Sequence, residues 1–204
     1  MPLSKAHKDQ SRRKIIDAAG ELFRRHGYDG VGIDTIMAKA GLTRGGFYAH
    51  FASKAALFAD VLAVEPAFNR MLAQRPGETR GELMDSALEV LGNYLDPARV
   101  PHVASTCPMV SLSRDVDKAG HAGRAALTHV VEDLAGQLKR GMTGAAQDPR
   151  TLAVLALCIG GVTIARTADT PATAKAVLDA CRREAVRLLG AKPRAKARKA
   201  RVRH

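Results

Sequence analysis

The side chains best suited to binding chemistry lie in one short segment, TRGGFYAHFASK. At about 100° per residue, a helix brings Arg44, Gly45, Tyr48 and Ala49 onto one face, which holds no carboxylate. An arginine fork donates two parallel hydrogen bonds to a base edge or a phosphate. Gly45 and Gly46 weaken a helix by roughly 1 kcal/mol each, and close approach of bare backbone to such a group is a reason to keep them. The pattern predicts a surface that binds DNA.

Two short helices joined by a tight turn must position this face. The first has apolar residues at the helical spacing i, i+3, i+4 and i+7: Ile33, Ile36, Met37 and Ala40. Gly41 suits the left-handed residue that ends this helix, and Thr43 suits the N-cap of the second. Phe47 and Phe51 lie four residues apart and can pack on the first helix. Lys54 begins the next helix, where its ammonium group suits a phosphate. The order predicts a helix-turn-helix.

An upstream helix ending at Gly27 completes a small three-helix domain. Its apolar stripe comprises Ile15, Ile16, Ala19, Leu22 and Phe23. Basic residues precede or begin this stripe: Lys5, Lys8, Arg12, Arg13 and Lys14. They form either a solvated, frayed end or a helix start that lies along phosphates, and the sequence leaves both interpretations open.

The run AGLTRGGFYAHFASK, preceded by IIDAAGELFRRHGY, resembles the TetR family of bacterial transcriptional regulators over about residues 11 to 60. The resemblance implies an all-α chain, with an N-terminal helix-turn-helix domain and a C-terminal helical domain for ligand binding and dimerisation. It also implies three partners: a double-stranded DNA operator, a second copy of the chain, and a small-molecule or electrophile effector. No cofactor or metal is expected.

The resemblance assigns roles to individual residues. Arg44 takes a base-reading position, and Thr43 caps the recognition helix beside the DNA backbone. Phosphate contacts fall to Tyr48, His50 and Lys54. Gly32 stands where the family usually has Ser or Thr, so Thr35 becomes the candidate for the phosphate contact at that end of the motif.

Composition is consistent with a DNA partner. The 204 residues carry a net charge of +12, of which the segment from Lys192 onward contributes seven bases and no acid, leaving +5 on the rest. A basic balance favours a polyanion. The apolar run from Leu152 to Ala165 is too short to span a membrane, and no signal peptide precedes the domain. Three cysteines without a C-x-x-C pair favour a reducing compartment. We expect a cytoplasmic, nucleoid-associated protein with no membrane partner.

These patterns divide the chain into a DNA-binding domain (1–52), a helical effector-binding and dimerisation domain (53–190) and a disordered basic tail (191–204). The second domain should open with a helix from Ser53 that continues beyond Glu65, and Pro66 should either kink this helix or mark a break near its middle. A capping box starts another helix at Thr79, and residues 96–106 read as a loop. Gly120 and Gly123 read as a break before the next helix.

The last two helices should form a dimer interface. Each is expected to start at an N-cap followed by proline, at Asp148-Pro149 and Thr170-Pro171. The first is apolar nearly all round, so it should be buried on every side. Leu155 and Leu178 are the positions where a charge should separate the dimer. The family resemblance implies a four-helix arrangement for this interface.

Cys107 is the one side chain suited to covalent chemistry. The run STCPMV puts it at a helix N-terminus, where the dipole should lower its pKa and favour the reactive thiolate. It is either a sensor of electrophiles or a small packing residue. Few aromatic residues follow position 58, so any effector pocket should be aliphatic. The candidates for its lining, which ordinary core packing also explains, are Phe68, Met71, Tyr94, Met109, Leu112 and Thr163.

No catalytic set emerges, because no histidine has a carboxylate, serine or cysteine partner at a motif spacing. An enzyme is therefore not expected. Two function classes remain. One is an effector-controlled regulator, predicted to be a repressor, that binds a palindromic operator as a homodimer. The other is an architectural protein that coats DNA without regard to sequence. Preference for one operator at physiological salt separates them.

Overall fold

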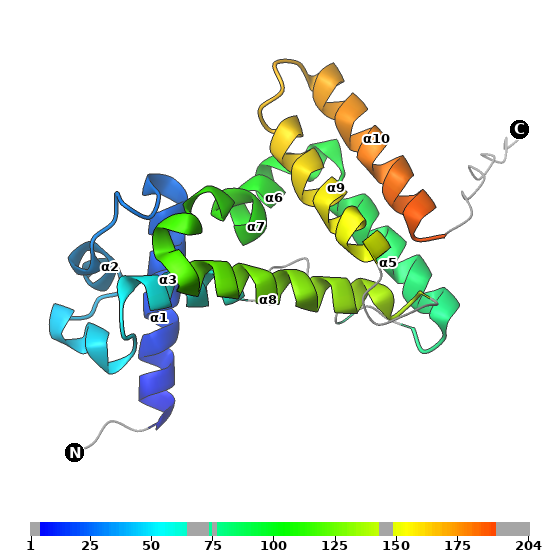
Figure 1. Cartoon of the computed structure of the whole chain (residues 1–204). Coiled ribbons are helices and arrows are strands. Elements are labelled where there is room, and N and C mark those ends of the chain that lie inside the picture. Colours follow the sequence, from blue (N-terminus) through cyan, green and yellow to red (C-terminus); the bar gives the residue numbers. More distant parts are fainter. Residues whose placement is uncertain (1–4, 65–73, 75–76, 143–148, 191–204) are drawn as a thin grey trace, which may run out of the picture.

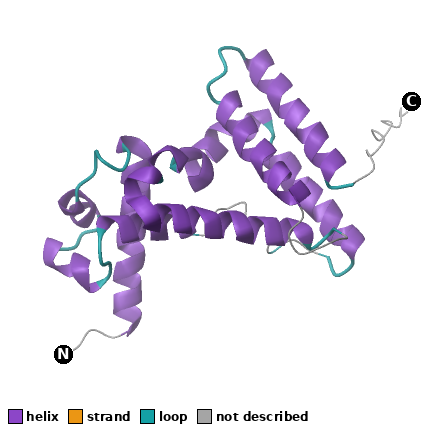
Figure 2. Cartoon of the chain, in the orientation of Figure 1, coloured by secondary structure: helices purple, strands orange, loops and turns teal. Residues whose placement is uncertain are grey.

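The computed structural model describes residues 5–64, 74, 77–142 and 149–190 (Figure 1). Within these ranges every regular element is a helix (Figure 2), as the sequence predicts. The predicted tail (191–204), the N-cap candidate Asp148 and the pocket candidates Phe68 and Met71 lie outside the described residues.

The N-terminal part comprises α1 (Lys5–His26), α2 (Ile33–Lys39), the 3-10 helix η1 (Arg44–Ala49) and α3 (Lys54–Ala63). Because α1 is continuous from Lys5, the basic residues near its start belong to a helix. Gly27 (φ 73°) and Gly41 (φ 69°) hold the left-handed conformation expected after α1 and α2. α3 ends at Ala63, since Val64 leaves the helical conformation with ψ at 114°. Of the two alternatives predicted at Pro66, a kink or a break, the end of α3 at Ala63 favours a break, and Glu65 and Pro66 themselves lie outside the described residues.

One apolar core joins these helices to part of the second half of the chain. Phe23 and Phe58 are fully buried and meet edge to face, with ring centroids 5.3 Å apart. The same core contains Leu112, Val116 and Ala119. α3 and α8 lie against each other (Figure 1), which ties the helix-turn-helix to the rest of the molecule.

The second half begins with α5, whose start shows the predicted capping box. The elements are α5 (Arg80–Tyr94), η2 (Pro97–Arg99), α6 (Val100–Thr106), α7 (Pro108–Ser111), η3 (Ser113–Asp115), η4 (Asp117–Ala119), α8 (Gly120–Lys139), α9 (Pro149–Ala165) and α10 (Pro171–Leu188). Thr79 accepts the Glu82 N–H, and the Glu82 carboxylate accepts the Thr79 N–H. Thr170 caps α10 as predicted, by accepting the Thr173 N–H.

The expected loop at 96–106 is instead helical. Asp96 accepts the Ala98 N–H, and Pro97 occupies the first position of η2. Pro101 lies in the first turn of α6, where its missing N–H costs no hydrogen bond. The closely spaced prolines therefore start two short helices rather than interrupting one long one.

The expected break between Gly120 and Gly123 is shorter than predicted. Gly120, at φ 62°, already begins α8, and Gly123 is buried inside the helix. A Cβ on Gly123 would lie only 2.5 Å from the Val116 carbonyl oxygen. Gly123 thus lets the start of α8 approach the preceding turn closely.

α9 and α10 lie side by side at the end of the molecule away from α1 (Figure 1). Leu155 and Leu178 are buried within the chain itself, at 3% and 0% exposure. By contrast, Leu152 and Ile164 of α9 are 49% and 55% exposed. The prediction that α9 is buried on every side is wrong for a single chain, and Leu155 and Leu178 are core residues rather than free interface positions.

Candidate nucleic-acid interface

The predicted recognition face is exposed on η1. Phe47 is fully buried against α2, whereas Tyr48 is 63% exposed and Arg44, Gly45 and Ala49 share its solvent-facing side. A Cβ on Gly45 would meet no atom within 4 Å, so packing within the chain does not require this glycine. An approaching partner remains a reason for it.

Of the two threonines in the motif, Thr43 differs from expectation and Thr35 stays a candidate for a phosphate contact. Thr43 stands at the N-cap of η1, but its side chain accepts no capping hydrogen bond, so that part of its prediction is wrong. Gly32 is the N-cap of α2, and Thr35 is exposed in the first turn of that helix. Both threonine hydroxyls are on the outer side of the motif, where a phosphate contact is sterically open.

Asp34 is a neighbour of the candidate recognition face that sequence reasoning missed. Its carboxylate accepts a hydrogen bond from the Arg44 guanidinium at 2.8 Å, and both side chains are about two-thirds exposed. η1 itself carries no acid, but α2 supplies one to its leading arginine. Arg44 is therefore paired with an acid ten residues earlier in the chain.

Lys54 makes contacts inside the chain. Its ammonium group donates to the carbonyl oxygens of Tyr28 and Val31 at 2.9 and 3.0 Å and lies 4.2 Å from the centroid of the Tyr28 ring. These contacts close the turn between α1 and α2 over the start of α3. Two of the three ammonium N–H groups are engaged there, so the predicted phosphate contact has at most one left to use.

His50 follows η1 and is half-buried. Burial, followed by the positive charges of Lys8 and Arg12, lowers the pKa of the imidazole. Its Nδ1 atom is buried and has no hydrogen-bond partner within the described part of the chain. A neutral ring still donates one N–H, which is what the predicted phosphate contact requires.

The start of α1 adds positive charge next to the motif. Lys5, Lys8, Arg13 and Lys14 are exposed, and the first turn contains no acid. Arg12 instead pairs with Asp60 and lies 4.8 Å from the centroid of the Phe51 ring, which ties α1 to α3 and η1. Lysines at a helix N-terminus repel its dipole, and a phosphate there would relieve that repulsion.

Cys107 is a buried thiol rather than an activated one. It is the N-cap of α7 as predicted, but it is only 7% exposed and accepts a 3.3 Å hydrogen bond from the Tyr94 hydroxyl. Burial raises the pKa of the Cys107 thiol, outweighing the hydrogen bonds that favour the thiolate. The predicted lowering of this pKa is wrong, because one turn of helix does not compensate for desolvation.

The other candidate pocket residues do not form one lining. Tyr94, Met109 and Cys107 belong to a second apolar core, which is formed mainly by α5, α8, α9 and α10. Leu112 belongs instead to the first core, which contains Phe23 and Phe58. Thr163 is half-buried on α9 and donates its hydroxyl to the Ile159 carbonyl oxygen at 2.7 Å. Across the described ranges, no group of three His, Cys, Asp or Glu side chains could hold a metal ion. Nor is any helix described there both long and apolar enough to cross a membrane.

Sequence comparison places the helix-turn-helix among known regulators. Residues 15–61 match the family described as "Bacterial regulatory proteins, tetR family". The chain is 43% identical over 58 residues to the HTH-type transcriptional regulator SrpR of Pseudomonas putida, a segment that makes up 28% of this chain and 27% of SrpR. The curated relatives are thus matched over much less than two thirds of their length.

The remainder of the fold has counterparts among solved structures. The reduced form of E. coli NemR superimposes with a TM-score of 0.66 at 17% identity, covering 90% of this chain and 98% of NemR. The multidrug binding protein EbrR, complexed with imidazole, gives a TM-score of 0.63 at 23% identity, covering 89% and 91%. Residues 15–61 thus match the TetR family, and the helical fold of the described chain is similar to that of these two structures.

Proposed function

We propose that the protein is a homodimeric transcriptional repressor that binds a palindromic double-stranded operator and releases it when a small effector binds. The observation that carries this proposal is the exposed face of η1, on which Arg44 and Tyr48 project from a helix pair fixed by the buried Phe47. A rigid helix pair that presents an arginine is the arrangement that reads a major groove.

In this proposal the DNA contacts divide by chemistry. Arg44 and the backbone at Gly45 reach base edges, whereas phosphates are contacted by Thr35, Thr43, Gly46, Tyr48, His50 and Lys54. The exposed lysines at the start of α1 extend the phosphate contacts along the backbone. Asp34 must release Arg44 when a guanine or phosphate replaces the carboxylate as its partner.

Dimerisation follows from the surface of the last two helices. Leu152 and Ala156 are exposed on α9, and Ala172, Ala176 and Ala180 are exposed at intervals of four along α10. Such small residues let a second copy approach closely, and its own α9 and α10 would complete a four-helix interface with two-fold symmetry. A symmetric dimer matches a palindromic operator.

The effector is proposed to be a small molecule that binds reversibly. EbrR, which shares the fold, is described as a multidrug binding protein. The raised pKa and burial of Cys107 favour a packing role for that thiol over electrophile sensing.

Selection of DNA from a random duplex library at physiological salt tests the proposal. We expect one palindrome to bind at least about a thousandfold more tightly than random duplex. Arg44→Ala should abolish that preference. Equal binding of all duplexes by the parent protein would favour the architectural alternative and refute the repressor.

A further inference from the structure

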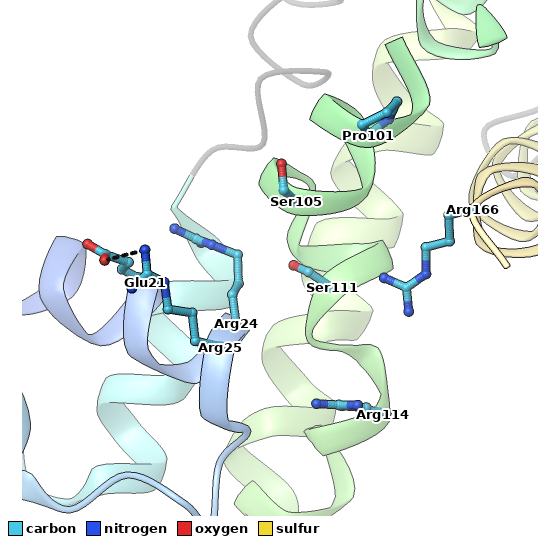
Figure 3. Close-up of a pocket in the computed structure, with 8 residues that line it drawn as sticks. All are labelled: Glu21, Arg24, Arg25, Pro101, Ser105, Ser111, Arg114 and Arg166. Carbon is cyan, nitrogen blue, oxygen red and sulfur yellow. Dashed lines mark ion pairs between the residues drawn. The ribbon is translucent and has the colours of Figure 1, made fainter. Parts of the chain in front are cut away.

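A polar cavity of about 440 Å³ lies between the helix-turn-helix part and the second half of the chain (Figure 3). α1 supplies one wall, and the opposite walls come from α6, α7, the turn after α7 and the residue following α9. Its lining comprises Glu21, Arg24, Arg25, Pro101, Ser105, Ser111, Arg114 and Arg166. None of these residues belongs to the aliphatic pocket predicted from sequence.

Positive charge dominates this cavity. Four arginines line it against a single carboxylate, Glu21, which is already paired with Lys39 at 2.9 Å and Arg25 at 3.5 Å. Arg114 lies 3.7 Å from the Asp115 carboxylate, and the charge of Arg24 also acts on Glu21, where it helps to lower the pKa of that carboxyl. The C-termini of α1 and α9 each contribute roughly −0.5 charge, so the cavity keeps a clear positive excess. A concave surface of one sign concentrates its field on a ligand of the opposite sign.

The Arg24 side chain lies over Gly20, one turn earlier in α1. A Cβ on Gly20 would lie 3.2 Å from a terminal guanidinium nitrogen of Arg24. Glycine at position 20 therefore leaves the space in which the Arg24 side chain rests. Figure 3 shows the Arg166 and Arg114 side chains extending from the opposite elements, on the side of the cavity facing α1.

Ser105 and Ser111 restrict the chemical groups that a ligand of this cavity can carry. The Ser105 hydroxyl donates to the His102 carbonyl oxygen at 2.9 Å, and the Ser111 hydroxyl donates to the Cys107 carbonyl oxygen at 2.9 Å. With their hydrogens engaged, both oxygens have lone pairs free to accept hydrogen bonds. A ligand that satisfies arginines and serine acceptors together carries anionic groups and hydroxyl donors.

The cavity is separated from the proposed DNA surface. Arg24 lies near the C-terminus of α1, and Lys5 and Lys8 lie near its N-terminus, roughly 25 to 30 Å away at 1.5 Å per residue (Figure 1). Duplex bound along η1 and the start of α1 would leave the cavity open to a small molecule.

We propose that this cavity binds a small hydroxylated polyanion, such as a hydroxy-polycarboxylate or a sugar phosphate, through Arg24, Arg114 and Arg166. The ligand contacts α1 on one side and the elements from α6 onward on the other. Its binding therefore fixes the orientation of the helix-turn-helix relative to the second half of the chain. Resting on the proposed repressor function, this bridge makes the anion an effector that changes operator affinity.

Calorimetric titration of the full chain, without DNA, tests the site directly. The probes are citrate and 6-phosphogluconate, with tricarballylate as the citrate analogue that lacks the hydroxyl, all at matched ionic strength. We expect one site per chain, with citrate or 6-phosphogluconate bound at micromolar to low millimolar Kd. The tighter of these two probes identifies carboxylate or phosphate as the preferred group. Tricarballylate should bind several-fold more weakly than citrate, and equal affinity would overturn the role of the serines.

Matched variants locate the site. Arg166→Gln and Arg114→Gln should each weaken binding of the tighter probe about tenfold, the loss expected for one charge-assisted hydrogen bond. Arg80→Gln removes the same charge from an exposed position at the start of α5, outside the cavity, and should leave binding unchanged. Equal weakening by all three variants, or no binding by the parent protein, would overturn the site.

DNA binding is then measured with and without the tighter probe. A change in operator affinity that is absent in Arg166→Gln supports the effector role, whereas anion binding without any such change overturns that role and leaves the site standing. If Arg166→Gln weakens DNA binding without anion present, the cavity arginines contact DNA and the small-ligand assignment is wrong. Because calorimetry requires no operator, failure of the repressor proposal stays distinguishable from failure of the site.

Discussion

At the scale of single residues, the ion pair between Arg44 and Asp34 governs the candidate interface. Both partners are exposed, so the pair contributes at most about 1 kcal/mol to folding. On the proposed role of Arg44, the larger effect of the pair is on DNA binding, because the carboxylate would compete with phosphate and base for the guanidinium and would itself repel DNA. The proposal therefore predicts that Asp34 disfavours binding to DNA that offers Arg44 no better partner.

Replacing Asp34 with asparagine should tighten binding to random duplex several-fold and reduce discrimination between operator and random DNA, since Arg44 no longer has to leave a carboxylate. Fluorescence anisotropy at two salt concentrations measures both affinities. Asp169→Asn removes the same charge from an exposed position before α10 and should leave DNA binding unchanged. Weaker binding by Asp34→Asn would mean that the carboxylate orients Arg44 for the operator.

Lys54→Ala should destabilise the fold by about 1 to 3 kcal/mol, because the carbonyl oxygens of Tyr28 and Val31 lose a charged donor. Urea unfolding followed by circular dichroism measures this loss. Lys14→Ala, at an exposed position on α1, serves as the control and should leave stability unchanged. An unchanged midpoint for Lys54→Ala, together with weaker binding to every duplex, would show that its main role is the phosphate contact.

Native thiol labelling should modify Cys181 before Cys107, because Cys181 is partly exposed whereas Cys107 is buried with a raised pKa. Ellman's reagent on the native protein gives the rates. The fastest phase should disappear in Cys181→Ser and persist in Cys107→Ser. If Cys107→Ser removes the fastest phase, electrophile sensing at that thiol regains support.

At the scale of elements, α9 has two different apolar surfaces. Leu155 and Val162 are buried in the second core, whereas Leu152 and Ile164 face solvent in the single chain. A helix with this distribution needs a second partner to cover its outer side. Removing an outer residue should therefore affect assembly, and removing an inner one should affect folding.

Leu152→Glu and Ile164→Glu should give folded monomers that lose operator binding, because a charge in an apolar interface is not solvated. Sedimentation velocity and circular dichroism report assembly and folding separately. Val64→Glu places the same charge on an exposed apolar position at the end of α3 and should stay dimeric. Dimers in both α9 variants would put the interface elsewhere.

At the scale of the whole molecule, the two cores meet on α8, where Leu127 packs against both. The first core includes Leu112, Val116 and Ala119 from the second half of the chain. The helix-turn-helix is therefore packed directly against that half and is not connected to it by a flexible linker alone. The second core contains ionisable groups in neutral form: burial raises the pKa of Tyr94, Cys107 and Cys158. Each of these groups releases its proton more easily in the unfolded chain.

Stability should therefore fall as pH rises. A group whose pKa is raised by folding contributes fully below its unfolded pKa, near 8.5 for cysteine and 10 for tyrosine, and loses that contribution above it. Urea unfolding at pH 7, 9 and 10.5 should show a declining free energy of unfolding. Cys158→Ala should make the decline shallower by up to about 1.4 kcal/mol per pH unit. The same slope in both proteins would exclude Cys158 as a contributor.

The sequence by itself determined the features that depend on neighbours along the chain. The helical stripe from Ile33 to Ala40, the turn at Gly41 and the capping box at Thr79 follow from periodicity and backbone preference, which act within one or two turns. The family resemblance covers the same local pattern. The two short helices within 96–106 were predicted as a loop because a proline can start a helix as well as end one.

Only the tertiary structure decided which side chains meet across the chain and which are buried. The partners of Arg44 and Lys54 lie ten to twenty-six residues away, at no spacing that a motif specifies. Cys107 stands at a helix start, as the sequence predicts, yet desolvation by the surrounding core outweighs the local dipole. The arginine cavity draws its lining from five parts of the chain, and its charge exists only where the fold brings them together.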